Sequence, residues 1–175
     1  MSKIKVLKII IGPIILIIWG IIFLLEDGYS VELKNLQFIK FKYEIKILEK
    51  HLDTLGHVNN AVYLQLLEEA RWDFITERGF GIDEVLKRKI GPIIISTEIK
   101  YRRELKNRES ITIESYVVQI MDRLRYKLKQ VIYCEGEKVA AEALFVMGFM
   151  DLEKRKLVNI LPEFMVALGA TETTV

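Results

Sequence analysis

The stretch HLDTLGHVNNAVYLQLLEEARWDF, residues 51–74, changes character part-way along. Its first ten residues hold an aspartate, both histidines of the chain and an Asn-Asn pair. The remainder places apolar residues on one face of a helix, namely Tyr63, Leu67, Ala70 and Phe74. An asparagine side chain readily accepts from the free N–H groups at a helix start, so Asn59 or Asn60 is the expected N-cap. The stretch therefore predicts a buried helix that follows a polar loop and ends near Gly79.

Strands surround this helix along the sequence. Residues 41–47, FKYEIKI, alternate apolar and charged side chains, which is the period of a strand with one buried face. After a short helix over 81–89, four more strands are predicted, over 93–105, 110–120, 124–133 and 138–150. In the first of these, one face is expected to hold Ile93, Ile95, Thr97, Ile99 and Tyr101. Short turns make such neighbours antiparallel, so one helix and one sheet predict an α+β domain over residues 37–175, with a last helix over 161–169.

The N-terminal region has a different composition. Residues 9–25, IIIGPIILIIWGIIFLL, are 17 uncharged residues, close to the ~20 needed to cross a bilayer. We therefore expect residues 1–36 to form an apolar membrane-anchor helix and a linker. A cleaved signal peptide or a hairpin bent at Gly12-Pro13 are the alternatives. Lysines on both sides of the segment leave its orientation undecided.

Composition excludes several function classes. A formal charge of +2, from 26 basic and 24 acidic residues, gives no basis for nucleic-acid binding. The single cysteine, Cys134, permits no disulfide within the chain, and two histidines do not supply a His/Cys zinc site. Neither a serine-hydrolase elbow nor a glycine-rich nucleotide loop is present in the sequence.

The polar loop offers a specific chemistry. Asp53 lies just ahead of a helix N-terminus, where unpaired N–H groups and positive potential stabilise a developing oxyanion. A carboxylate there can act as nucleophile or as general base for water, which suits attack on an acyl carbon. Spacing alone leaves alternatives open: Asp53 as a turn residue, His57 as a packed loop histidine, and Asn59 or Asn60 as a cap only.

The same stretch resembles the signature of hotdog-fold acyl-CoA thioesterases of the 4-hydroxybenzoyl-CoA thioesterase-like superfamily. Within that group it is most similar to the bacterial long-chain acyl-CoA thioesterases. The matching features are Asp53, the run His57-Val58-Asn59-Asn60, Tyr63, and Glu68 with Ala70 and Arg71. Further on, KYRREL over 100–105 resembles a Y-R-R strand end of the family, and the likeness spans roughly residues 38–169.

The resemblance implies a hotdog fold, a sheet wrapped around a long central helix. It implies that Asp53 is catalytic, that His57 holds the loop or donates to the leaving group, and that Asn60 orients water or substrate. The residues expected to contact substrate are Asn59, Tyr63, Arg102 and Arg103, with the two arginines meeting the CoA phosphates. Glu68 and Arg71 have ion-pair spacing and a structural role, and Glu69 is a weaker candidate acid.

The resemblance also implies partners and location. Fatty acyl-CoA of medium to long chain is the expected substrate, in a homodimer or dimer of dimers with sites at subunit interfaces and without metal or cofactor. With the apolar segment, this predicts a membrane-associated protein whose domain faces the cytosol. Two other functions remain: a non-catalytic, membrane-tethered acyl-binding protein, and a hydrolase of acyl chains on a carrier protein docked at Arg125, Lys127 and Lys129.

Overall fold

The computed structural model describes residues 36–171. One antiparallel sheet carries most of the chain in the order β2-β4-β5-β6-β3, and β7 pairs with the far end of β6. The strands are β2 (Phe41–Lys46), β3 (Ile90–Tyr101), β4 (Ser110–Ile120), β5 (Arg125–Cys134), β6 (Lys138–Asp151) and β7 (Lys156–Leu157). A separate two-stranded sheet joins β1 (Gln37–Phe38) to β8 (Ala170–Thr171) near the two ends of the described chain.

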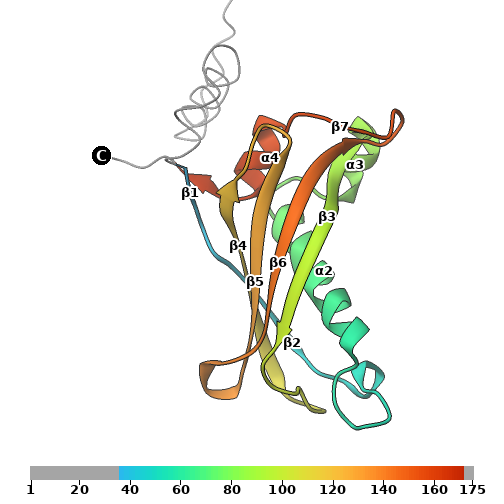
Figure 1. Ribbon diagram of the computed structural model, residues 1–175, viewed down its shortest axis with the longest axis vertical. Helices are drawn as coiled ribbons and strands as arrows, with labels where there is room; N and C mark the ends of the chain where they lie inside the picture. Colours follow the sequence, from blue (N-terminus) through green and yellow to red (C-terminus); the bar gives the residue numbers. More distant parts are fainter. Residues whose placement is uncertain (1–35, 172–175) are drawn as a thin grey trace, which may run out of the picture.

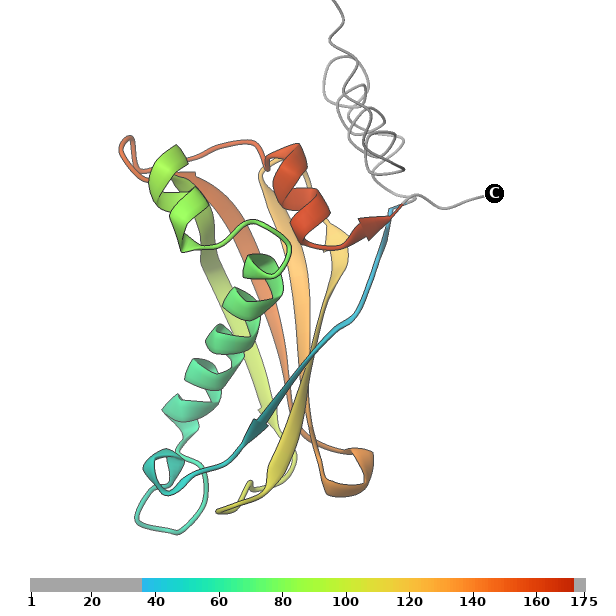
Figure 2. The ribbon, with the colours of Figure 1, turned by 180° about the vertical axis from the view of Figure 1, so that it is seen from behind.

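The helices cover one face of the curled sheet (Figures 1 and 2). They are α2 (Asn60–Thr76), α3 (Ile82–Arg88) and α4 (Pro162–Ala167), with short 3₁₀ turns η2 (Glu49–His51) and η3 (Glu135–Glu137). The long helix α2 runs along the concave side, while α4 covers the end of the sheet away from the start of α2. The α+β class and the order strand, long helix, short helix, four strands are confirmed.

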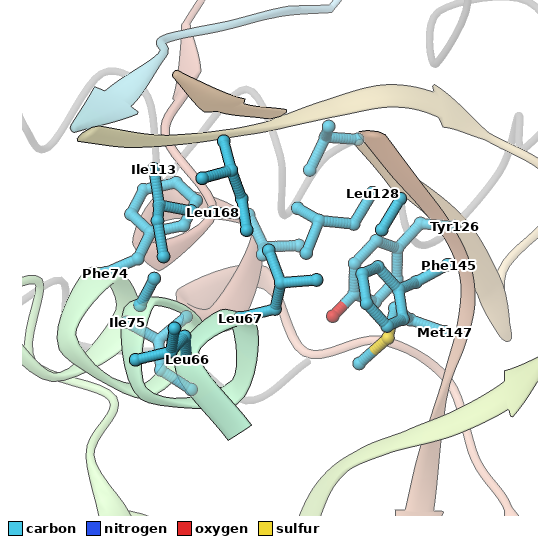
Figure 3. Close-up of a cluster of buried hydrophobic side chains, with 14 of the residues drawn as sticks. Leu66, Leu67, Phe74, Ile75, Ile113, Tyr126, Leu128, Phe145, Met147 and Leu168 are labelled. Carbon is cyan, nitrogen blue, oxygen red and sulfur yellow. The ribbon is translucent and has the colours of Figure 1, made fainter. Parts of the chain in front are cut away.

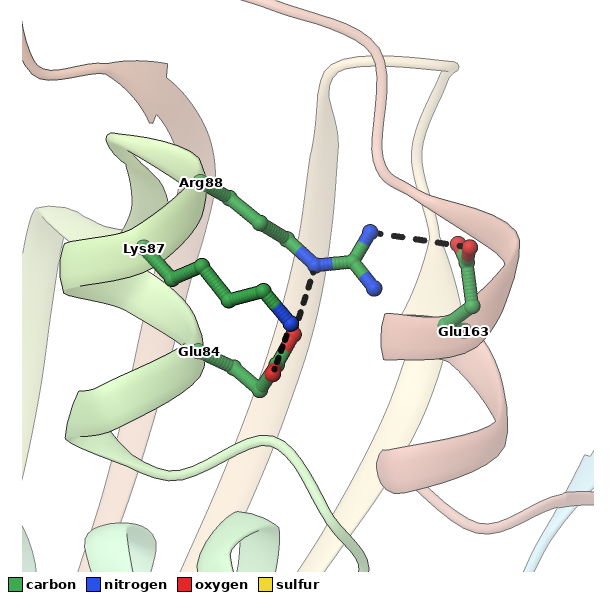
Figure 4. Close-up of polar contacts among 4 residues, drawn as sticks. All are labelled: Glu84, Lys87, Arg88 and Glu163. Carbon is green, nitrogen blue, oxygen red and sulfur yellow. Dashed lines mark hydrogen bonds and ion pairs between the residues drawn. The ribbon is translucent and has the colours of Figure 1, made fainter.

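The core lies between α2 and the inner face of the sheet. Figure 3 shows Leu66, Leu67, Phe74 and Ile75 of the helix meeting strand residues such as Phe145. The four residues predicted to share one face of the helix are all buried. At the α4 end, Phe164 is fully buried against Phe80 and Phe149, with ring centroids 4.9 and 4.6 Å away. Outside this cluster, Arg88 joins Glu84 of its own helix, 2.9 Å away, to Glu163 of α4, 3.6 Å away (Figure 4).

A buried polar network crosses the middle of the core. Gln130, which is completely buried, donates to the Leu67 carbonyl oxygen at 3.0 Å and to Ser115 Oγ at 2.8 Å. Its Oε1 accepts from Arg71 Nη1 at 2.8 Å, and the Arg71 guanidinium lies 4.4 Å from the Phe145 ring centroid. Burial lowers the pKa of Arg71. Arg71 is thus hydrogen-bonded to Gln130 of the sheet. Within residues 36–171 it forms no ion pair with Glu68, although the two residues have ion-pair spacing.

The structure corrects the predicted face of β3. A register shift between Ile94 and Ser96 breaks the alternation, so Ile94, and not Ile93, lies opposite the core residue Met147. Such a bulge turns the following side chains to the other face of the strand. The small sheet of β1 and β8 was not predicted, because two-residue strands carry no readable period.

The predicted localisation also requires correction. Within the range that the structure describes, no helix is long and apolar enough to cross a membrane. The predicted N-terminal apolar helix over residues 9–25 lies outside the described residues. The division into 1–36 and 37–175 remains a prediction.

The aromatic cluster around Phe164 gives a stability test. Phe164→Ala removes a fully buried ring, and we expect it to lower the free energy of unfolding by about 3–5 kcal/mol. Leu86→Ala, at an apolar side chain exposed on α3, is the control and should change it by no more than about 0.5 kcal/mol. Urea unfolding followed by circular dichroism measures both, and equal small losses would contradict this packing.

Candidate active site at the start of the central helix

The loop before α2 folds back on itself as a short antiparallel pair. Asn59 N donates to the His51 carbonyl oxygen at 3.0 Å, Leu52 bridges Val58, and Asp53 N donates to the His57 carbonyl oxygen at 3.0 Å. Gly56, with φ 82°, closes the turn between the two legs. Asp53 and His57 are therefore held opposite each other. The loop that carries them lies at the end of the molecule remote from α4 (Figure 1).

The Asp53 carboxylate divides its two oxygens between two neighbours. Oδ1 accepts from Leu55 N at 2.8 Å, which is the turn role that spacing allowed. Oδ2 lies 3.5 Å from His57 Nδ1, and both side chains remain partly exposed. The turn contact thus orients the carboxylate of Asp53, whose side chain is 23% exposed.

Within the described chain, the capping of α2 leaves one backbone N–H group at the helix start without an acceptor. Asn59 is the N-cap, and its Oδ1 accepts from Ala61 N at 2.9 Å. The Asn59 carbonyl oxygen accepts from Val62 N and Tyr63 N, at 3.0 and 3.3 Å. Among the hydrogen bonds of the described residues, the Asn60 N–H has no acceptor. This donor at the positive end of the helix is available to a ligand oxygen.

Two tyrosines form a wall beside this donor. Tyr63 OH donates to the Arg103 carbonyl oxygen at 3.3 Å, and the Tyr63 ring meets Tyr101 edge-on with centroids 5.0 Å apart. Tyr101 OH in turn donates to the Asn60 carbonyl oxygen at 3.4 Å. Burial raises the pKa of Tyr63 to about 12, so this phenol stays protonated and neutral near pH 7.

These groups surround a pocket of about 420 Å³. Its lining includes six of the seven residues expected from the sequence, namely Asp53, His57, Asn60, Tyr63, Arg102 and Arg103. The seventh, Asn59, acts as the cap and does not line the pocket. Sequence reasoning assigned no role to Val58, Tyr101 or Glu104, which also line it; Tyr101 was detectable as the first residue of the Y-R-R strand end.

The two arginines differ in how they are paired. Arg102 Nε lies 3.3 Å from Glu142 Oε1, and Glu142 also receives Lys129 at 3.0 Å. The hydrogen bond from Lys129 lowers the pKa of Glu142. In residues 36–171, no carboxylate lies within ion-pair distance of Arg103. Arg103 is therefore the more available anion-binding group.

The weaker candidate acid lies elsewhere on the helix. Glu69 Oε1 accepts from Tyr43 OH of β2 at 2.6 Å, and Glu69 does not line the pocket. Desolvation and this bond to Glu69 raise the pKa of Tyr43 to about 12. Nor does the part of the chain that the structure describes bring together three or more His, Cys, Asp or Glu side chains able to hold a metal.

Comparison with known proteins identifies the family. A model described as the thioesterase-like superfamily matches residues 48–168. The long-chain acyl-CoA thioesterase FadM of Escherichia coli (strain K12) is 37% identical over 114 residues, which cover 65% of this chain and 85% of FadM. The chain therefore belongs to the thioesterase-like superfamily, and it is a thioester hydrolase.

Solved structures agree. The probable thioesterase YbaW of Escherichia coli is 34% identical, with a TM-score of 0.63 over 73% of this chain and 95% of its own. A Staphylococcus aureus protein solved in complex with CoA is 16% identical, with a TM-score of 0.69 over 74% of this chain and 82% of its own. At that identity the likeness shows the fold alone, and the expected hotdog arrangement is confirmed.

The cap at Asn59 can be tested directly. Asn59→Ala removes the acceptor for Ala61 N, and we expect it to lower the free energy of unfolding by about 1 kcal/mol. Asn59→Ser restores an acceptor and should recover most of that loss. Amide exchange at Ala61, measured by NMR, should accelerate in the alanine variant only; equal protection in both variants would rule out the cap.

Proposed function

We propose that this protein hydrolyses fatty acyl-CoA, with Asp53 as nucleophile or general base. The observation that carries the proposal is that Asp53 and Asn60, whose N–H has no acceptor within residues 36–171, line the same pocket. A thioester carbonyl between them would have a hydrogen-bond donor beside its oxygen, where negative charge develops, and a base or nucleophile near its carbon. The long-chain acyl-CoA substrate in the name of FadM supports the class of substrate.

Two routes use the same geometry. In one, an Asp53 oxygen attacks the carbonyl carbon, the C–S bond breaks with release of CoA thiolate, and water then cleaves the resulting anhydride. In the other, Asp53 takes a proton from water as the water oxygen attacks the same carbon. In both, the Asn60 N–H stabilises the negative carbonyl oxygen, and the thiolate is protonated on leaving. His57, whose Nδ1 lies 3.5 Å from Asp53 Oδ2, holds the carboxylate or supplies that proton. The side-chain amide of Asn60 orients water.

The preference for medium to long chains has a separate support. A second, smaller cavity of about 90 Å³ lies farther along α2, with Trp72, Ile94 and Phe164 in its lining. From Asn60 to Trp72 the helix rises roughly 18 Å. An acyl chain that extends along α2 from the pocket to this cavity would have to span roughly this distance, which suits a medium to long chain.

Asp53 is tested by substitution. We expect Asp53→Asn to lower kcat by about 100- to 10,000-fold, since the amide can neither attack nor accept the proton. Thiol release from acyl-CoAs of increasing chain length measures this, and wild-type kcat/KM should favour medium to long chains. Asp83→Asn, an exposed acid on α3, is the matched control. Full activity of Asp53→Asn, or no hydrolysis of any acyl-CoA by the wild type, would refute the proposal.

Arg103 is proposed to meet the CoA phosphates. Removing its charge should raise KM for acyl-CoA roughly 10-fold, the size of one charge-assisted contact. Arg103→Gln should leave KM unchanged for the same acyl group on N-acetylcysteamine, which carries no phosphate. Arg102→Gln, at the arginine already paired with Glu142, should have the smaller effect. An equal rise in KM for acyl-CoA and for the N-acetylcysteamine thioester would exclude a phosphate contact.

The two other functions find less support. Pure acyl binding does not require a carboxylate placed beside an unpaired helix N–H. For carrier-protein docking, two of the three proposed basic groups are already paired: Arg125 with Asp122 at 2.6 Å and Lys129 with Glu142 at 3.0 Å. Measuring kcat/KM for an acyl chain on the carrier protein and for the same chain on CoA separates this alternative from acyl-CoA hydrolysis.

We also propose that two copies pair through β3. Within residues 36–171, this 12-residue strand is an edge bonded to β6 alone, and it exposes Ile94, Ile95 and Tyr101. An exposed apolar edge favours addition of another strand. Light scattering should give twice 20.4 kDa for the wild type. Ile95→Asp should give mostly monomer, whereas Val118→Asp, at an exposed valine of β4, should not; a monomeric wild type would refute the pairing.

A further inference from the structure

One buried imidazole has no part in the mechanism above. His51 ends η2 and is 8% exposed, which makes it one of four buried polar or charged residues in the described chain. It stands two positions before Asp53 and does not line the pocket. Its Nδ1 accepts a hydrogen bond from Leu48 N at 3.1 Å, so Nδ1 carries no proton and a neutral ring carries its hydrogen on Nε2.

The backbone of His51 joins the two sides of the proposed site. Its N–H donates to the Leu48 carbonyl oxygen at 2.9 Å, which closes η2. Its carbonyl oxygen accepts from Asn59 N, the N-cap of α2, at 3.0 Å. His51 therefore connects the leg of the loop that carries Asp53 to the residue that precedes the unpaired Asn60 N–H.

The imidazole adds a side-chain hydrogen bond to the backbone bonds from His51 N and Leu52 N that hold that leg in η2. With the Leu48 N–H bonded to Nδ1 and the Leu48 carbonyl oxygen bonded to His51 N, residues 48–51 form a closed box. Loss of the Nδ1 acceptor would leave the Leu48 N–H unpaired and free η2 to turn. A displacement of 1 Å at a reacting group costs on the order of 100-fold in rate.

We propose that His51, in its neutral form, is a positioning residue that sets the distance between the Asp53 carboxylate and the Asn60 N–H. This inference rests on the proposed function, because it assigns those two groups to the reaction. It adds a third residue, which acts through the loop and touches no substrate.

The environment of His51 gives the proposal a pH dependence. Burial lowers its pKa, and Lys50 of the same turn lowers it further, while Glu69 of α2, itself bonded to Tyr43 of β2, opposes them. The unfolded chain, whose histidine pKa is about 6.5, therefore binds this proton more readily than the folded protein. Stability from neutral His51 is present above that value and is lost as the pH falls toward the folded pKa.

The test compares two substitutions in the full-length protein. Asn places Oδ1 near the position of the imidazole Nδ1 and can accept from Leu48 N, whereas Leu fills the space without an acceptor. We expect His51→Leu to lower kcat on acyl-CoA on the order of 10- to 100-fold with KM changed less than about threefold. His51→Asn should retain kcat within about threefold of wild type and should not lose activity as the pH falls through the His51 pKa. Glu49→Gln, at an exposed acid of the same turn paired with Arg108, is the control and should match wild type.

NMR supplies a readout that does not need activity. The chain has two histidines, so imidazole ¹⁵N signals can be assigned with a His57→Gln sample. His51 should be neutral with its proton on Nε2 at pH 7, and the amide signals of Asp53 and Asn60 should shift in His51→Leu but not in His51→Asn. If His51→Leu does not fold, the proposal is tested by the His51 tautomer in the wild type and by the pH profile of activity of His51→Asn.

Three results would overturn the proposal: a charged or Nδ1-protonated His51 at pH 7, wild-type kcat in His51→Leu, or equal loss of kcat in both folded variants. Failure of the proposed function is a different outcome. In that case Asp53→Asn and wild type behave alike on acyl-CoA, while the tautomer and the amide shifts still report whether His51 positions the loop.

Discussion

The arrangement of the site depends on the antiparallel pairing of residues 51–53 with 57–59. Backbone hydrogen bonds of 3.0 Å close both ends of this pair, and the outer one reaches the N-cap of α2. A helix start has N–H groups that need acceptors, and Asn59 satisfies three of them with its side chain and carbonyl oxygen. The one left over belongs to Asn60, which lines the same pocket as Asp53. Polar residues ahead of a buried helix thus cap the helix, and in the proposed mechanism they also carry out the hydrolysis.

The rest of the fold keeps this loop in place from outside. Val58 N donates to the Leu105 carbonyl oxygen at 2.9 Å, and Arg108 N donates to the Ile47 carbonyl oxygen at 2.9 Å. The segment after β3 therefore brackets the loop, and the same strand end delivers Tyr101, Arg102 and Arg103 to the pocket. At the other end of α2, the Phe164 cluster anchors the core. The helix α4, which carries Phe164, lies at the opposite end of the molecule from the loop before α2 (Figure 2).

Sequence patterns predicted the long elements because period and length are local properties. The strands over 41–47 and 110–120 and the helix predicted to begin at Asn59 or Asn60 were readable in this way, and so was the polar loop with Asp53. Features set by distant partners were not readable: the bulge beside Ile95 depends on β6, and the Arg71 contact is with Gln130 rather than the neighbouring Glu68. Six of the seven residues that the motif suggested line one pocket, whereas the contact of Tyr101 with Tyr63 and the burial of His51 depend on three-dimensional packing.

The proposed mechanism places the substrate carbonyl group between Asp53 and the Asn60 N–H. A crystal structure with a non-hydrolysable methylketone analogue of a long-chain acyl-CoA would show where that carbonyl binds. The predicted result is a ketone oxygen within about 2.7–3.1 Å of Asn60 N and an Asp53 oxygen facing the carbonyl carbon, or a water beside it. A ketone bound elsewhere in the pocket, with its oxygen on another donor and Asp53 out of reach, would contradict this mechanism.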